Sequence, residues 1–266
     1  MSTIVERDGP VTTIIRNRPE AKNAMHPDDA QALTEALLAF DADPAQSVAV
    51  LFGAGGAFCA GFDLKYAASL LRKEHPLCDL DFPSGEGPVP RGPMGPTRLA
   101  LGKPVIAAIA GPAVAGGMEL ALWCDIRVME ESAFMGVYCR RWGVPLIDGG
   151  TVRLPRIVGR GRALDITLTG RKVPAEECYS IGLCERLVPD GTSREAAEAL
   201  AREIARFPQD CMRADRRSIR LQEGLSEAEA LRAEWNNSVG VFEREGAAGA
   251  ARFAAGKGRH GDFESI

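Results

Sequence analysis

The sequence predicts an α/β fold followed by a helical region. Three observations predict it: apolar β-branched runs that end at glycine or turn residues, helical stretches that alternate with those runs, and a tail rich in Ala, Glu and Arg. The chain has 266 residues, 45% of them hydrophobic, which suffices for one large core with a smaller appendage. We expect a core over residues 1–192 and a C-terminal helical region over residues 193–266.

Strands are expected where a β-branched run ends at a turn signal. The segments are Val11–Asn17, Val48–Gly53, Pro104–Ala110 and Ile126–Met129. Pro27 and the two aspartates after it open a helix, because acidic residues suit the positive end of a helix dipole. Met118–Cys124 also has helical character. From Ser193 onward the pattern is helical, and Phe207-Pro208 and Gly224 divide it into separate helices.

The stretch Lys73–Pro96 interrupts this alternation. Its prolines are Pro76, Pro83, Pro88, Pro90, Pro93 and Pro96, and its glycines are Gly85, Gly87, Gly92 and Gly95. So many breakers cannot form one regular element. An irregular stretch of this length is a lid, a binding loop or a disordered segment.

Composition argues against several function classes. The formal net charge is −4 and no Lys/Arg run dominates any segment, so nucleic-acid binding is not expected. We find no signal peptide and no membrane-spanning run, and expect no membrane partner. Seven scattered cysteines without a Cys-x-x-Cys pair favour free thiols and a cytoplasmic location. The only histidines are His26, His75 and His260, a spacing that favours neither a histidine triad nor a metal site.

Two glycine-containing stretches, Ala57–Leu64 and Gly111–Leu120, carry the strongest chemical signal. Glycine lets a ligand approach backbone N–H groups closely, and the first N–H groups of a helix lack an internal acceptor. Glu119 follows Gly116 by three residues, so both lie on one helix face. Together the stretches suggest two donors around an oxyanion, with a carboxylate beside them. Glycine turns and a glutamate that only complements the helix dipole remain the alternative.

The ordered set of motifs resembles the crotonase superfamily, the enoyl-CoA hydratase/isomerase family, over nearly the whole chain. Besides the two stretches, the resemblance rests on these segments: Arg18–Met25, Cys124–Ile126, Gly149–Pro155, Leu168–Gly170, Gly182-Leu183, Glu245-Gly246 and Phe253.

The resemblance implies a spiral of ββα units with a C-terminal helical trimerisation region, as a homotrimer or a dimer of trimers. It implies an acyl-CoA thioester substrate whose carbonyl oxygen sits between the N–H groups of Phe62 and Gly116 while an enolate forms or collapses. Coenzyme A arrives with the substrate, so no separate cofactor is expected. The residues implied in CoA binding are Ala21, Lys22, Asn23, Ala24, Ala60, Asp63, Phe253 and Lys257.

The chain departs from the hydratase pattern at the second of two catalytic glutamates. The first matches Glu119, whereas the second position falls on Cys139. A thiol with a free pKa near 8.5 is a poor substitute for a carboxylate. Asp148 is the candidate replacement, as in the dienoyl-CoA isomerases that the chain resembles here. Its alternative role is a turn residue or a cap of the helix expected over Gly149–Ile157.

Cys139, Arg140 and Trp142 are candidates for the acyl pocket, although such residues are more often part of a surface turn. The first hypothesis is an enoyl-CoA hydratase-type lyase in which Glu119 is the principal acid/base and Asp148 assists it. The alternatives are a double-bond isomerase on the same scaffold and a weakly catalytic acyl-CoA-binding member of the family.

Overall fold

The computed structural model describes residues 1–71 and 77–258. His75, His260 and residues 73–76 of the predicted irregular stretch lie outside the described residues. The chain divides into two compact units, Met1–Glu203 and Ile204–Ile266, which are described separately below.

The first unit alternates strands and helices, which confirms the predicted α/β class. Its strands are β1 (Thr3–Asp8), β2 (Val11–Arg16), β3 (Val48–Gly53), β4 (Val105–Ile109), β5 (Pro112–Val114), β6 (Ile126–Glu130), β7 (Phe134–Gly136), β8 (Val173–Pro174) and β9 (Arg186–Val188). Its helices are α1 (Pro27–Ala42), α2 (Leu64–Ser69), α3 (Gly116–Trp123), α4 (Gly150–Val158), α5 (Arg160–Thr169), α6 (Ala175–Ser180) and α7 (Ser193–Ala205).

Six strands form the main sheet in the order β1-β2-β3-β4-β6-β9. β1 is antiparallel to β2, and every later pair in this sheet is parallel. All six residues of β2 and all five of β4 are buried, which explains why β4 is an apolar run and not an alternating pattern. The strands expected at Val11, Val48, Pro104 and Ile126 are all present.

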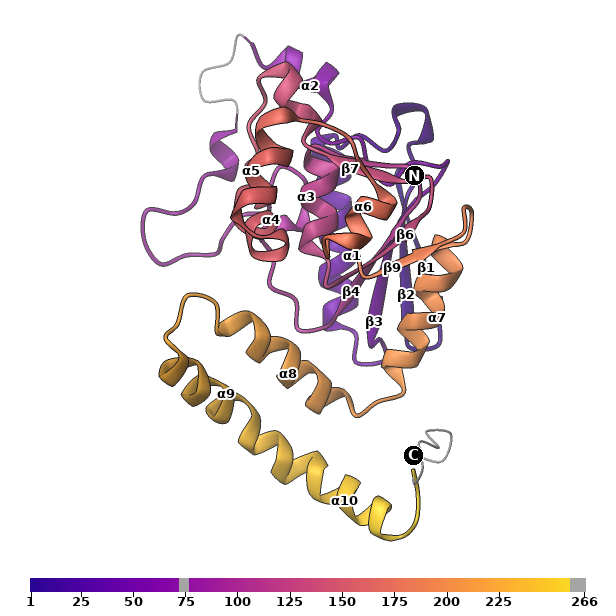
Figure 1. The fold of residues 1–266 in the computed structure, drawn as a ribbon, viewed down its shortest axis with the longest axis vertical. Coiled ribbons are helices and arrows are strands. Elements are labelled where there is room, and N and C mark those ends of the chain that lie inside the picture. Colours follow the sequence, from indigo (N-terminus) through magenta and orange to yellow (C-terminus); the bar gives the residue numbers. More distant parts are fainter. Residues whose placement is uncertain (72–76, 259–266) are drawn as a thin grey trace. The chain divides into compact units, whose positions relative to one another are not determined.

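A second sheet has the strand order β5-β7-β8. Its strand β7, labelled in Figure 1, follows the main-sheet strand β6 in the chain. The chain passes from β4 to β5 and then into α3, and later from β6 to β7 and then towards α4. Each pass therefore gives one strand to each sheet before the next helix, which is the expected ββα unit. These short second strands carry too few residues to be recognised from sequence periodicity alone.

The described part of the predicted irregular stretch, residues 77–96, contains no strand and only short 3-10 turns, at Cys78–Leu80 and beginning at Pro96. Gly92 and Gly95 close a tight turn, in which the N–H of each donates to the carbonyl of the other at 2.8 and 2.9 Å. The prediction of irregular structure is confirmed for these residues.

The second unit consists of α8 (Gln209–Leu221), α9 (Glu227–Val241), a π-helical turn (Phe242–Gly246) and α10 (Ala247–Ala254). Pro208 lies between α7 and α8, and Gly224 lies between α8 and α9, so both residues separate helices as predicted. Ser226 begins α9 with a capping box, in which its hydroxyl and the Glu229 carboxylate each accept a backbone N–H. Asn237 joins the helices by donating to the Ala214 carbonyl at 2.7 Å.

The first unit ends at Glu203, in the last turn of α7, so it includes most of the helix that the sequence assigned to the C-terminal region from residue 193 onward. The reason is that polar side chains fasten α7 to the first two strands. Thr13 donates to Glu198 at 2.8 Å, and Arg202 pairs with Asp8 at 3.1 Å. These contacts join residues far apart in the chain, which helical periodicity cannot reveal.

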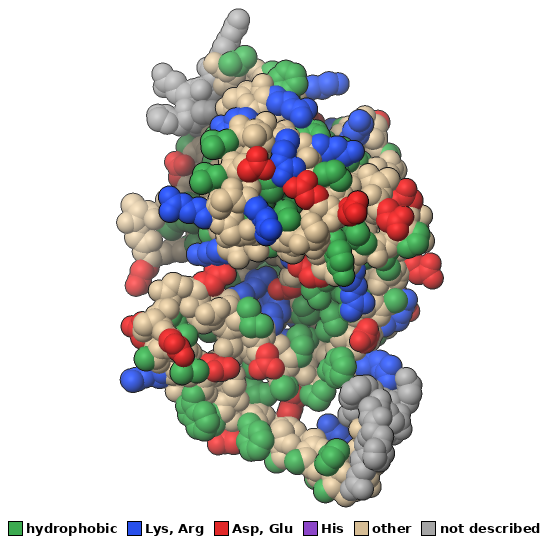
Figure 2. Space-filling model, in the orientation of Figure 1, with side chains coloured by type: hydrophobic (Ala, Val, Ile, Leu, Met, Phe, Trp, Pro, Cys, Tyr) green, Lys and Arg blue, Asp and Glu red, His purple; other side chains and the backbone are tan. Residues whose placement is uncertain are grey.

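On the face shown in Figure 2, acidic and basic side chains of the first unit are interspersed. This mixture differs from the single-sign stripe of a nucleic-acid-binding surface. Within residues 1–71 and 77–258, no helix combines the length and the apolar character needed to cross a membrane.

Candidate active site

The two glycine stretches lie side by side at the ends of β3 and β5. Cys59 donates to the Pro112 carbonyl and accepts from the Val114 N–H, both at 3.0 Å. Gly61 has φ +98°, and a Cβ there would lie 2.8 Å from Ala115 Cβ and 3.1 Å from Gly116 N. Only glycine therefore allows the first loop to approach the start of α3 this closely.

The backbone N–H groups of Phe62 and Gly116 are the two predicted oxyanion donors. None of the hydrogen bonds found among the described residues uses either group as a donor. Gly116 is the first residue of α3, where an N–H has no intrahelical acceptor. Phe62 and Gly116 line the same cavity, and Gly116 stands at the positive end of a helix.

Glu119 lies one turn into α3 and is 3% exposed. Its Oε1 accepts the N–H of Asp148 at 2.9 Å and that of Gly150 at 2.8 Å. A Cβ on Gly150 would lie 2.9 Å from this same Oε1, so glycine is needed for the approach. These two hydrogen bonds fix the carboxyl group through Oε1, and its second oxygen, Oε2, takes no part in them.

Asp148 is also 3% exposed, and it does not cap a helix. Gly149, in the left-handed region at φ +95°, precedes α4 as the N-cap residue. The Asp148 Oδ1 instead accepts the Met94 N–H at 3.0 Å and the Thr97 hydroxyl. The capping alternative is therefore wrong for this residue, because its carboxylate is directed toward the loop that precedes Arg98.

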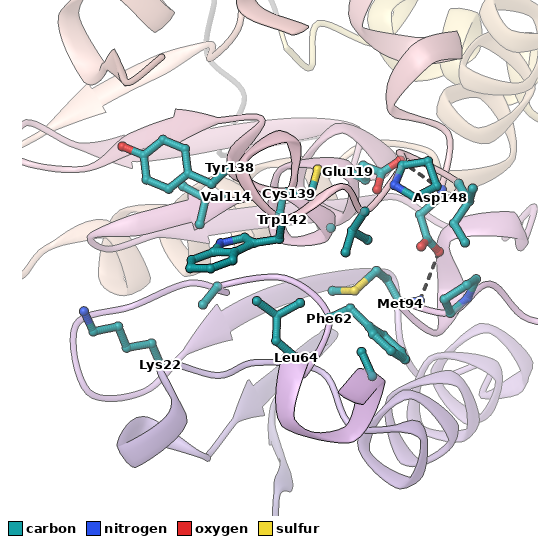
Figure 3. Close-up of a pocket in the computed structure, with 18 of the residues that line it drawn as sticks. Lys22, Phe62, Leu64, Met94, Val114, Glu119, Tyr138, Cys139, Trp142 and Asp148 are labelled. Carbon is teal, nitrogen blue, oxygen red and sulfur yellow. Dashed lines mark hydrogen bonds between the residues drawn. The ribbon is translucent and has the colours of Figure 1, made fainter. Parts of the chain in front are cut away.

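Both carboxyl groups line a cavity of about 480 Å³. Most of its wall is apolar, and its lining includes both predicted oxyanion residues together with Leu70, Leu77, Met94, Val144 and Ile147. Glu119 and Asp148 lie toward one end of this pocket and Lys22 toward the other (Figure 3). A volume of this size is typical of a site for a small organic ligand.

The three residues suggested for the acyl pocket occupy a 3-10 turn, Tyr138–Trp142. Cys139 and Trp142 line the cavity. Arg140 is exposed, is absent from the lining, and donates to the Thr167 carbonyl at 3.3 Å, so its expected place in the pocket is wrong. Burial raises the pKa of the Cys139 thiol and the nearby Glu119 charge raises it further, which keeps the thiol protonated at neutral pH.

The segment Arg18–Met25 is a loop that contains a short 3-10 turn, Pro19–Ala21, and contributes Lys22 to the pocket lining. Asn23 is fully buried at φ +55°, and its amide donates to the carbonyls of Ala54 and Ala57 at 2.8 and 2.7 Å. Arg18 pairs with Asp29 at 2.8 Å and with Asp63 at 3.2 Å. These interactions hold the loop against the first glycine stretch.

The structure distributes the predicted CoA-binding residues unequally. Lys22 and Ala60 line the pocket, and the Ala60 N–H donates to the Lys22 carbonyl at 3.0 Å. Ala21 and Ala24 lie in the same loop, whereas the side chains of Asn23 and Asp63 are engaged in internal contacts. Asp63 caps α2 by accepting the N–H groups of Lys65 and Tyr66. Phe253 and Lys257 are exposed residues of the second unit.

Sequence reasoning missed Met94, Thr97 and Arg153. Met94 and Thr97 are each 1% exposed and bond to Asp148. Arg153, from α4, donates to the carbonyls of Asp148 and Thr97 at 2.9 and 2.7 Å. The only available signal was a Met inside the Pro- and Gly-rich stretch and a Thr directly after it, and neither indicates what these residues contact.

Both buried carboxyl groups have raised pKa values. Burial and the negative charge of Asp148 raise the pKa of Glu119 to about 7, although two N–H donors oppose the rise. Burial also raises the pKa of Asp148, against the Thr97 and Met94 bonds and the charges of Arg98 and Arg153. A carboxyl group that titrates near neutrality can both accept and return a proton at physiological pH.

This shift predicts a pH-dependent cost to stability. The Glu119 pKa is about 7 in the fold against 4.5 for a free side chain, so between these values the folded protein binds more protons than the unfolded chain, and stability falls as pH rises. We expect Glu119→Gln to raise the free energy of unfolding by about 3 kcal/mol at pH 8, and by much less at pH 4.5.

Chemical denaturation at both pH values measures this difference. The same exchange at exposed Glu35 controls for the loss of one carboxylate. An equal gain from Glu119→Gln at both pH values would contradict the prediction.

Comparisons with known proteins agree with this geometry. The family model described as enoyl-CoA hydratase/isomerase matches residues 6–82 and 97–258. The protein named enoyl-CoA hydratase EchA19 from Mycobacterium tuberculosis is 36% identical over 246 residues, 90% of this chain and 88% of its own. A carnitinyl-CoA dehydratase from Salmonella arizonae is 38% identical over 200 residues, 74% of this chain and 72% of its own.

Solved structures give the same result. A crystal structure of enoyl-CoA hydratase from Mycobacterium tuberculosis H37Rv superposes with a TM-score of 0.85 at 35% identity, covering 96% of both chains. An enoyl-CoA hydratase from Bacillus anthracis gives a TM-score of 0.85 at 31% identity, also over 96% of both chains. The chain therefore belongs to the enoyl-CoA hydratase/isomerase family, within the crotonase superfamily.

Proposed function

We propose that the protein is an enoyl-CoA hydratase-type lyase that adds water to the double bond of a 2-enoyl-CoA, or removes it from the hydroxyacyl product. The observation that carries the proposal is the convergence of two buried carboxyl groups, Glu119 and Asp148, on one apolar pocket that the N–H groups of Phe62 and Gly116 also line. The family membership and the names of the relatives support the same class of reaction.

In this proposal the thioester oxygen lies between the two N–H donors. As the water oxygen bonds to C3, a carboxylate takes its proton, and the electrons of the double bond move toward the thioester to form an enolate. Return of a proton to C2 completes the addition. Glu119 is the principal acid/base because its pKa of about 7 suits both transfers, and Asp148 assists it.

We propose that coenzyme A is bound as part of the substrate and that no separate cofactor takes part. Lys22 is exposed and lines the pocket, and it provides a cation for the anionic coenzyme A. The backbone at Ala60, which also lines the pocket, contacts coenzyme A in this proposal. In this proposal Phe253 and Lys257 contribute to coenzyme A binding in the assembled oligomer. The apolar cavity of about 480 Å³ has room for an acyl group larger than four carbons.

We further propose a homotrimer or a dimer of trimers built through the second unit. Its helical segments expose several large apolar side chains, and an apolar patch on a surface is typical of a protein interface. These residues are Ile219, Leu221, Leu231, Trp235 and Phe242. The seven cysteines are all free, which suits a reducing compartment such as the cytoplasm.

A double-bond isomerase is the second candidate, and Asp148 favours it. Two carboxyl groups on different loops can take a proton from one carbon and return it to another without adding water. The position of the second family glutamate is occupied by Cys139, whose raised pKa leaves it without the charge that a base needs.

Product analysis in deuterium oxide distinguishes the candidates. With 2-enoyl-CoA thioesters of four to sixteen carbons, we expect a 3-hydroxyacyl-CoA that carries one solvent deuterium at C2. A shifted double bond without a hydroxyl group would identify the isomerase instead. Absence of turnover across the whole panel, with acyl-CoA still bound, would support the weakly catalytic alternative and contradict the proposal.

A further inference from the structure

The turn at Gly92–Gly95 lies in a part of the chain that the family model does not match. The matched segments end at residue 82 and resume at 97, so the turn falls in the interval between them. Its two reciprocal backbone bonds fix the peptide N–H of Met94, while the Met94 side chain lines the pocket. A segment outside the family model therefore contributes a side chain to the pocket that contains Glu119 and Asp148.

Two donors from this region converge on one atom, Oδ1 of Asp148. They are the Met94 N–H, at 3.0 Å, and the Thr97 hydroxyl. Among the described residues, no hydrogen bond ends on the other oxygen, Oδ2. Since Asp148 lines the pocket, this one-sided bonding leaves Oδ2 available for proton transfer with a ligand.

The residues around the hydrogen bond between Thr97 and Asp148 restrict which side chains can occupy neighbouring positions. A Cβ on Gly92 would overlap both Thr97 Oγ1 and Asp148 Oδ1, so only glycine leaves room for the bond between them. Arg153 donates to the backbone carbonyls of both Asp148 and Thr97. It thereby fastens the donor loop and the acceptor loop to the same helix, α4.

We propose that Thr97, with the Gly92–Gly95 turn, is a positioning residue that holds Asp148 by one oxygen and keeps the other directed at the acyl carbons. This inference rests on the role of Asp148 in the proposed function, but the arrangement itself does not depend on which reaction occurs. A hydrogen bond to a carboxylate stabilises its charged form, so Thr97 also favours the state of Asp148 that accepts a proton.

The test compares Thr97→Val, which keeps the shape and removes the donor, with Thr97→Ser, which keeps the donor. We expect Thr97→Val to lower kcat about ten- to hundredfold, the size of a lost bond to a charged group, with KM changed less than about twofold. The Thr97→Ser variant should retain most of the kcat of the unmodified protein. Thr97→Ala gives a second removal of the hydroxyl if the valine variant does not fold.

A matched control exists in Thr12. It is 1% exposed, like Thr97, and its hydroxyl donates to the Gln46 side chain at 2.6 Å within the core. Thr12→Val should reduce stability by a similar amount without the loss of kcat. An equal fall in kcat for both valine variants would mean that Thr97 acts only through stability and would overturn the proposal.

The dependence of kcat on pH distinguishes a positioning role of Thr97 from a purely structural one, because a loss of stability alone would not shift it. Asp148 faces Glu119 from α3, Arg153 from α4 and Arg98 from the 3-10 turn. These charges stay the same in Thr97→Val, while the bond that lowers the Asp148 pKa is lost. The acidic limb of the kcat profile should therefore move to higher pH in the valine variant and return in the serine variant.

Carbon-13 NMR of labelled aspartate measures the same shift without turnover, with Asp148→Asn identifying the signal. A higher Asp148 pKa in Thr97→Val supports the positioning role even if no enoyl-CoA is hydrated, an outcome that would contradict the proposed function alone. An unchanged Asp148 titration in Thr97→Val would overturn the inference, whatever the reaction.

Discussion

Replacement of Glu119 by glutamine should lower kcat about a thousandfold, within the range observed for the loss of a general acid or base. Glutamine has the same shape, and its carbonyl oxygen can still accept the N–H groups of Asp148 and Gly150 that the glutamate oxygen accepts. The fold of the site should therefore survive, and only the capacity to take and return a proton is lost.

Two measurements together check this expectation. Single-turnover kinetics on the best 2-enoyl-CoA give the fall in the chemical step, and calorimetry with a saturated acyl-CoA gives binding. We expect the dissociation constant to change less than about threefold, because an interaction made only in the transition state contributes nothing to ground-state binding. Cys139→Ala is the control within the pocket and should retain most activity. Near-normal turnover by Glu119→Gln would remove Glu119 from the mechanism.

The second large effect is expected at the Phe62 amide. Replacing this residue by phenyllactic acid changes its backbone N–H to an ester oxygen and leaves the side chain intact. Loss of one oxyanion donor typically lowers kcat by about 10²- to 10³-fold, and we expect the same here. The Phe62 N–H has no acceptor among the hydrogen bonds of the described residues, so its removal breaks no structural bond.

Phe58 offers the matched control, because its N–H donates to the Ala110 carbonyl at 2.8 Å. The same ester at position 58 should cost about 1 kcal/mol of stability while kcat changes little. A kcat for the Phe62 ester equal to that of the unmodified protein would show that its N–H is not an oxyanion donor.

The principal elements of the fold could be predicted from the sequence because their signals are local. Strands β3 and β4 are apolar runs, β2 is rich in β-branched residues, and helices such as α1 begin with proline and acidic residues. The short strands β5, β7, β8 and β9 have only two or three residues. Their pairing depends on partners distant in the chain, which periodicity does not report.

The site divides in the same way. The sequence by itself identified Gly116 and Glu119 as candidates, because a glycine before a helix and a carboxylate one turn later have consequences that follow from local geometry. The family resemblance added Phe62 as the second donor. The resemblance also made Asp148 a candidate, while leaving open whether that residue caps a helix.

Only the tertiary structure decided what surrounds Asp148. Met94 and Thr97 lie about fifty residues away from it in the sequence, and Arg140, only eight residues before it, points elsewhere. Hydrogen bonds and burial depend on distance in space, so a carboxylate in a loop has no fixed partner until the loops are packed. The sequence thus determined which chemical groups the protein possesses, and the packing of its loops determined which of them meet.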